Sequence, residues 1–216
     1  MKIITQTFIL LIAVSVFPLV IFGQTKSITR ENYLSALKEA ETKTEKEIRK
    51  EVSIQKLYAN GEITRTLTNT TEHLPPDRSR WLGITAEGNS VGRIEQILVG
   101  NFYYRKENEG EWVKRAVVDD EGIGLGGGFG GTDDSTREYF IEEAKIGKEK
   151  FQVLIEKTVN FNKTYFDERR IWISKKGLIF KEAATTSFME LKNIVSSIDV
   201  VYDYKVKPAK IEPPVK

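Results

Sequence analysis

Strand-length segments separated by tight-turn signals fill most of this 216-residue chain and restrict the folds open to it. Asn60-Gly61 is a strong hairpin signal, and residues 62–71, rich in β-branched side chains, follow it. Further turns are expected at residues 108–110, at Gly147 and at Lys176-Gly177. The spacing predicts about eleven short strands in an antiparallel meander, and nothing in it resembles a βαβ alternation.

One amphipathic helix is predicted ahead of these strands. Ser27 or Thr29 can cap it, and it should end near residues 43–45. Apolar side chains recur along it at helical spacing, with lysine and glutamate on the other face; these are Tyr33, Leu34, Leu37 and Ala40. The expected class is therefore α+β, with one helix and a large antiparallel sheet.

The N-terminus has the pattern of a secretory signal peptide. One lysine precedes an apolar run from Phe8 to Phe22, and Gly23 offers a small residue for cleavage. The apolar run is shorter than the roughly 20 residues of a spanning helix, although an uncleaved anchor stays open. We therefore expect residues 1–23 to be a signal peptide and residues 24–216 a single domain, located in the periplasm or secreted.

The overall composition excludes several classes of protein. There are 33 Lys and Arg against 31 Asp and Glu, and loss of Lys2 with the leader leaves a net charge of +1, too little for a nucleic-acid surface. The absence of cysteine rules out disulfides and thiolate metal sites. A secreted chain of this length must therefore be held by its hydrophobic core.

The glycine-rich stretch GIGLGGGFGG, residues 122–131, fits the G-x-G-x-x-G spacing of dinucleotide-binding loops. Such a loop needs a strand before it and a helix after it, whereas here Asp133 and Asp134 come next and a strand is expected. A plain surface loop is the simplest interpretation. A second is a flap whose apolar side chains cover a hydrophobic opening or contact a lipid surface; these are Ile123, Leu125 and Phe129.

The sequence offers little support for catalysis. His73 is the only histidine, it is expected in a solvated loop, and no G-x-S-x-G motif accompanies it. Acidic residues flank the glycine-rich stretch at 119–121 and 133–134, and a hydrolase that uses them is a minor alternative. We expect no enzyme activity, no cofactor and no metal site.

Apolar and aromatic side chains are spread over many of the expected strands. Each is either an ordinary core residue or part of the lining of a lipid cavity, in which the helix residues Tyr33, Leu34 and Leu37 would take part. The strand candidates for such a lining are Trp81, Phe102, Tyr104, Trp112, Phe151, Val153, Ile155, Ile171 and Ile173.

The order of leader, helix ENYLSALKEAE and long strand series resembles the LolA/LppX-like superfamily of periplasmic lipoprotein and lipid carriers. The hairpin around WISKKGL, residues 172–178, and the final VVYDYKVKPAKIEPP carry most of the resemblance. It implies a half-open barrel with the helix on its concave face and acyl chains bound between them. It also implies a second lid helix, for which residues 79–90 or 90–100 are the available segments.

Two functions follow as expectations. The first is a non-enzymatic protein that binds lipid or the acyl chains of a lipoprotein, with transient membrane contact. The second is an envelope protein-interaction or stress-sensor module of the same fold that has no lipid ligand.

Overall fold

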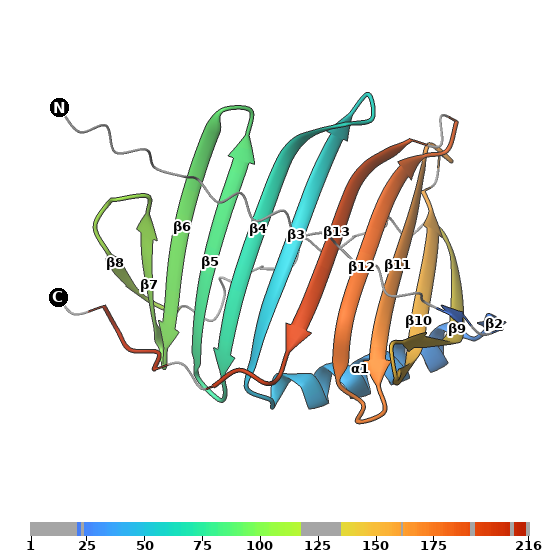
Figure 1. Ribbon diagram of the computed structural model, residues 1–216, viewed down its shortest axis with the longest axis horizontal. Helices are drawn as coiled ribbons and strands as arrows, with labels where there is room; N and C mark the ends of the chain where they lie inside the picture. Colours follow the sequence, from blue (N-terminus) through green and yellow to red (C-terminus); the bar gives the residue numbers. More distant parts are fainter. Residues whose placement is uncertain are drawn as a thin grey trace, which may run out of the picture.

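The computed structural model describes one helix and a single 13-stranded antiparallel sheet (Figure 1). The described residues are 21–22, 24–117, 135–160, 162–190, 193–207 and 210–214. The elements are β1 (Ile21–Phe22), β2 (Lys26–Ser27), α1 (Arg30–Glu45), β3 (Arg49–Ala59), β4 (Glu62–Leu74), β5 (Arg78–Glu87), β6 (Ser90–Val99), β7 (Phe102–Glu107), β8 (Val113–Ala116), β9 (Thr136–Ile146), β10 (Glu149–Val159), β11 (Tyr165–Ser174), β12 (Ile179–Phe188) and β13 (Ile194–Asp203).

Helix α1 begins and ends where the sequence predicts. The Thr29 side chain accepts a hydrogen bond from the backbone N–H of Asn32 at 3.3 Å, which satisfies one of the free donors of the first turn. The helix ends at Glu45, and the N–H of Lys46 turns back to the carbonyl of Lys43. Capping at Thr29 rather than Ser27 is therefore the form that the chain adopts.

The strands do not form the single meander that was predicted. Strands β9 to β13 form one meander and β3 to β8 another, and the last strand, β13, pairs with the first long strand, β3. The pairing joins Ile198 to Gln55 and Val200 to Ser53. Strands β9 to β12 therefore lie at the helix end of the sheet, with β13 between them and β3. The strand pattern alone could not indicate this long-range pairing.

The eleven long strands β3 to β13 agree with the predicted number, and the Asn60-Gly61 turn closes the β3–β4 hairpin. Both turn residues have positive φ, 53° and 83°, as this hairpin requires. The two segments considered for a second lid helix are strands β5 and β6. Within the part of the chain that the structure describes, α1 is the one helix.

The sheet buries apolar side chains on both faces at its β9–β12 end. On one face, α1 packs on a core of Tyr139, Leu154, Ile171, Ile173 and Ile179. On the other face a second core contains Ala144, Phe151, Val153, Ile155 and Trp172. Successive residues of a strand point to opposite faces, so Leu154 belongs to the first core and its neighbours Val153 and Ile155 to the second.

The observed class is one N-terminal helix packed on a large antiparallel sheet, as the α+β prediction has it. The sheet is open, since β1 and β8 lie at its two ends and among the described strands have no pairing with each other. The sheet is also not strongly curled (Figure 1). The prediction of an open antiparallel sheet with a helix on one face is therefore confirmed, and the curling into a half-open barrel is not seen.

Candidate functional site

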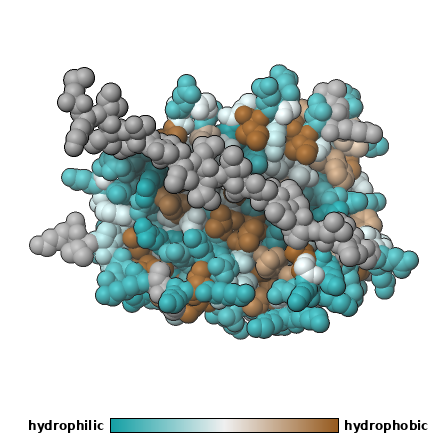
Figure 2. Space-filling model, viewed as in Figure 1, coloured by the Kyte–Doolittle hydropathy of each residue, from teal (hydrophilic) through white to brown (hydrophobic). Residues whose placement is uncertain are grey.

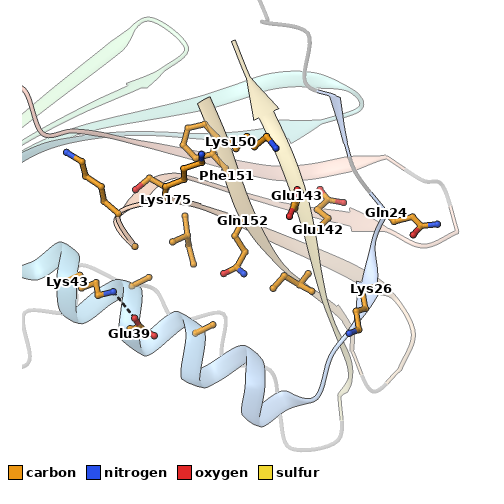
Figure 3. Close-up of a pocket in the computed structure, with 17 residues that line it drawn as sticks. Gln24, Lys26, Glu39, Lys43, Glu142, Glu143, Lys150, Phe151, Gln152 and Lys175 are labelled. Atoms are coloured by element: carbon orange, nitrogen blue, oxygen red, sulfur yellow. Dashed lines mark hydrogen bonds and ion pairs between the residues drawn. The ribbon is translucent and has the colours of Figure 1, made fainter. Parts of the chain in front are cut away.

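The candidate site is a groove of about 760 Å³ between α1 and the β9–β12 end of the sheet (Figure 3). Three parts of the chain form it: the segment that contains β2, one flank of α1, and β9 and β10 with the β11–β12 turn. Its lining consists of Gln24, Lys26, Ala36, Glu39, Ala40, Lys43, Ile141, Glu142, Glu143, Lys150, Phe151, Gln152, Ile173, Ser174, Lys175, Lys176 and Gly177.

The buried face of α1 fixes one wall of this groove. Tyr33 and Leu37 are in the core, and the Tyr33 ring lies 4.9 Å from that of Tyr139. At the end of the helix, the Thr44 hydroxyl accepts a hydrogen bond from the N–H of Ile179 at 3.0 Å. These contacts hold the flank that carries Ala36 toward the sheet.

Small and apolar side chains form the apolar part of the groove. Ala36 and Ala40 lie one helical turn apart, so the helix presents a flank with little bulk there. The larger apolar members of the lining come from the sheet: Ile141 and Ile173 lie on the face toward α1, whereas the Phe151 side chain belongs to the core of the opposite face. The short helix side chains opposite Ile141 and Ile173 leave space that a ligand can fill.

Lysines surround this apolar part. Lys43 is held by Glu39, 2.7 Å away, as the dashed line in Figure 3 marks. For the other four, no ion pair is found among the described residues; they are Lys26, Lys150, Lys175 and Lys176. These lysines therefore give the rim free positive charge.

The acidic members of the lining balance this charge only in part. Glu142 is buried, and its carboxylate is bound by Arg170 at 3.2 Å and by the Thr25 hydroxyl at 3.0 Å. Glu143 is exposed on the neighbouring position of β9. The rim is thus positive overall, which suits an anionic group.

A buried polar network lies beneath α1 next to the groove. The Tyr33 hydroxyl donates to Glu156 at 3.4 Å, Arg169 pairs with Glu182 at 2.7 Å, and the Tyr202 hydroxyl donates to Glu182 at 2.6 Å. Burial, reinforced by the neighbouring carboxylates, raises the pKa of Tyr33 and of Tyr202. Both phenols therefore stay neutral and act as hydrogen-bond donors that position the helix on the sheet.

The predicted cavity residues divide into three groups. The first group is packed between α1 and the sheet and consists of Tyr33, Leu37, Ile171 and Ile173. Leu34, also on α1, has 46% of its surface exposed and faces away from this core. The second belongs to the opposite face and consists of Phe151, Val153 and Ile155. Of the residues in these two groups, Ile173 lines the groove from the face toward α1, and Phe151 lies at the groove although its side chain belongs to the opposite core.

The third group lies toward the far end of the sheet. Trp81 is on β5, where its ring lies over Gly83, whereas Phe102 and Tyr104 are on β7 and Trp112 just precedes β8. Lys114 lies 4.0 Å from the Phe102 ring and 5.8 Å from the Tyr104 ring. The flap candidates Ile123, Leu125 and Phe129 lie outside the described residues, as do the acidic residues 119–121 and 133–134.

His73 is on strand β4 and half-buried, not in the solvated loop that was predicted. Its Nε2 lies 3.2 Å from Glu51, which Arg49 also contacts at 2.6 Å. Burial acts to raise the pKa of the Glu51 carboxyl, but His73 and Arg49 outweigh it and hold that pKa below its usual range. This cluster lies at the end of α1 and not in the groove, and Arg49 also donates to the carbonyl of Thr44.

The groove residues Ala36, Lys150 and Lys175 are not among the site residues predicted from the sequence. Ala36 and Ala40 are four residues apart, but alanine is common in any helix, so the spacing alone does not mark a binding site. The lysines are far apart in the sequence and meet only in the folded chain. No group of three or more metal-binding side chains is found among the described residues, and no helix there is long and apolar enough to span a membrane.

Comparison with known proteins gives similarities of structure only. No protein-family model and no curated protein matches the chain. LprF from Mycobacterium bovis is similar in structure with a TM-score of 0.43 and 10% identity, over 88% of this chain and 100% of that one. A putative outer membrane lipoprotein-sorting protein domain from Vibrio parahaemolyticus gives a TM-score of 0.33 and 10% identity, over 83% and 95% of the two chains.

A LolA-superfamily protein from Nitrosomonas europaea gives a TM-score of 0.32 and 11% identity, over 79% of this chain and 91% of that one. The chain is thus similar in structure to LprF and to LolA-superfamily lipoprotein-sorting proteins, with low identity and high coverage.

Proposed function

We propose that this protein is a non-enzymatic carrier of an amphiphile, either a lipid or the acyl chain of an acylated protein. The groove beside α1 supports the proposal, because it combines apolar side chains with a lysine rim. An acyl chain would lie against Ala36, Ala40 and Ile141, and an anionic head group would lie among the lysines.

The size of the groove fits such a ligand. Its volume, about 760 Å³, is within the range of about 300–1,000 Å³ that is typical of small-molecule sites. Each methylene group that leaves water contributes about 0.8 kcal/mol, so one acyl chain supplies enough free energy for stable binding. The lysines add selectivity for a negative head group, and this part of the affinity falls with rising salt.

The predicted signal peptide, residues 1–23, is consistent with a carrier that works in the periplasm or outside the cell. We propose the same location for this protein, with transient membrane contact while the ligand is loaded. A sheet that curls further around α1, as in a half-open barrel, would enclose the acyl chain more completely.

Native mass spectrometry of the exported protein, with organic extraction of the same sample, tests whether a lipid is bound. A near-stoichiometric adduct with the mass of an acyl species is expected. A mass without ligand, together with no uptake from added anionic phospholipid vesicles, would contradict the proposal.

Two tryptophan substitutions locate the ligand. Ala36→Trp places an indole in the groove and should reduce binding of a fluorescent fatty acid at least tenfold. Ser35→Trp, on the exposed side of the same helix turn, is the matched control and should leave binding unchanged. Equal binding by both variants would place the ligand elsewhere.

A protein-interaction module without a lipid ligand is the second candidate. One observation favours it: apolar side chains form cross-strand rows on the face opposite α1, where Val201 pairs with Val52, and Ile54 and Ile84 flank Thr68. Ile54, Ile84 and Val201 are 38%, 37% and 45% exposed. Figure 2 shows apolar side chains in the middle of one face of the molecule, with hydrophilic side chains around them.

A further inference from the structure

The segment after β13 crosses to the far end of the sheet. In Figure 1 it leaves the lower end of β13, passes the lower ends of β3 to β5 and continues toward β7 and β8. Ile211 in this segment is only 3% exposed, and its carbonyl accepts a hydrogen bond from the Arg78 guanidinium at 3.1 Å. The C-terminal segment is therefore attached to the sheet.

An open cleft of about 640 Å³ lies where this segment meets the β7–β8 hairpin. From the sheet it is lined by Arg78, Val99, Tyr104, Trp112 and Lys114, and from the segment by Glu212, Pro213 and Pro214. We call this space the C-terminal cleft. It is at the opposite end of the sheet from the groove beside α1, so it does not depend on the proposed function.

The strand register explains why aromatic and basic side chains meet in this cleft. Tyr104 and Lys114 are direct cross-strand partners, so their side chains lie on the same face of the hairpin. Trp112 immediately precedes β8, and Lys106 lies 5.5 Å from its ring. The result is a surface with two aromatic rings and several positive charges.

The occupant of this surface has a matching chemistry. Pro213 and Pro214 favour an extended polyproline backbone that loses little entropy on binding, and aromatic-lined grooves are the usual partners of such segments. Glu212, which precedes the prolines and also lines the cleft, forms an exposed ion pair with Lys210 of the same segment at 2.9 Å.

We propose that the C-terminal cleft is a recognition site for extended, proline-containing segments of a partner protein, and that the chain's own Glu212–Pro214 segment occupies it intramolecularly. The space remaining beside the segment indicates that the site is only partly filled. A partner segment of the same kind displaces the resident one and binds in its place.

The test uses the full-length chain and a fluorescein-labelled peptide with the sequence of residues 207–214, KPAKIEPP. In the variant Pro213→Ser/Pro214→Ser the resident segment is weakened at one exposed and one half-buried position near the end of the chain, so the fold is preserved. This variant should bind the peptide several-fold more tightly than the unmodified chain does. A peptide with both prolines replaced by serine should not bind.

Neighbouring tyrosines of β7 provide a matched pair. In the double-serine background, Tyr104→Ala should reduce peptide affinity at least tenfold, whereas Tyr103→Ala, on the opposite face of the strand, should not. The NMR signal of the Trp112 indole N–H in the double-serine protein gives a readout that needs no destabilising substitution. The peptide should shift this signal and leave that of Trp81 unchanged.

Three results would overturn the proposal: no peptide binding by the double-serine variant, equal affinity of this variant and the unmodified chain, or binding that leaves the Trp112 signal unshifted. Each is distinct from a failure of lipid binding, since the peptide and the acyl probe report on opposite ends of the sheet.

Discussion

At the scale of single residues, Arg49 links α1 to the sheet. Its side chain is 9% exposed; Nε contacts Glu51 at 2.6 Å, and Nη1 donates to the carbonyl of Thr44 at 3.1 Å in the last turn of the helix. A positive charge at a helix C-terminus also interacts favourably with the helix dipole. One side chain thus neutralises a half-buried carboxylate and satisfies a free carbonyl.

Arg49→Met should therefore destabilise the protein strongly. Removing Arg49 leaves the half-buried Glu51 with His73 as its remaining partner and takes the side-chain donor away from the buried Thr44 carbonyl, and we expect a loss of about 3 kcal/mol in the free energy of unfolding. Urea denaturation followed by circular dichroism measures it. Arg65→Met is the control, because the Arg65–Glu87 pair is exposed and 3.9 Å long, and it should cost less than about 0.5 kcal/mol. Similar losses in both variants would contradict this role of Arg49.

At the scale of elements, the β3–β4 hairpin shows how local chemistry decides a turn. Asn60 and Gly61 both have positive φ, a conformation that Asn and Gly adopt more readily than other residues. The strand register shifts between Leu57 and Tyr58, just before the turn. This is the reason why the turn could be predicted from two residues.

Gly61→Ala should cost about 1 kcal/mol, because alanine is strained at a φ of 83° even though no atom lies within 4 Å of the added methyl group. Gly92→Ala, on β6, also meets no atom and lacks the positive φ, so it should be neutral or slightly stabilising. Thermal unfolding of the two variants distinguishes them. An unchanged midpoint for Gly61→Ala would show that the strain is relieved by movement of the turn.

At the scale of the whole molecule, the pairing of β13 with β3 unites two meanders into one sheet. One half carries α1 and the groove beside it, and the other carries the C-terminal cleft. Trp172 on β11 and Trp81 on β5 report on the two halves. Contacts between strands so far apart in sequence carry a large loop-closure cost, and we expect this pairing to hold the halves in one cooperative unit.

Val200→Pro should break this unit. Val200 has paired neighbours on both sides, Glu182 and Ser53, so proline removes a ladder hydrogen bond in a central strand, at a cost of about 3 kcal/mol or more. Urea unfolding followed through each tryptophan separately, in chains where the others are phenylalanine, should then give two transitions where the unmodified chain gives one.

Lys114→Pro, on the edge strand β8, should leave the unfolding transitions of the two tryptophans coincident. Coincident transitions in Val200→Pro would mean that the β13–β3 pairing does not couple the halves.

Local signals determined the parts of the structure that depend on neighbours in sequence. Helix α1 follows from helical spacing and its start from the side-chain hydrogen bond of Thr29. The turns follow from residues that accept positive φ, and the eleven strands β3 to β13 from the segments between those turns. These preferences act over a few residues, so the sequence alone contains them. Two predictions from the sequence were wrong. His73 lies in strand β4 and not in a loop, and the segments considered for a second helix are strands β5 and β6.

Only the tertiary structure decided the β13–β3 pairing, the face of each strand and the site. Successive side chains of a strand point to opposite faces, so Val153 and Ile155 lie opposite to Leu154, although all three are apolar. A one-residue difference in register would exchange the two faces, and only the tertiary packing fixes that register. The groove joins Ala36 on the helix to Lys150 and Lys175 on distant hairpins. Such contacts depend on how whole elements pack, and no local preference specifies that packing.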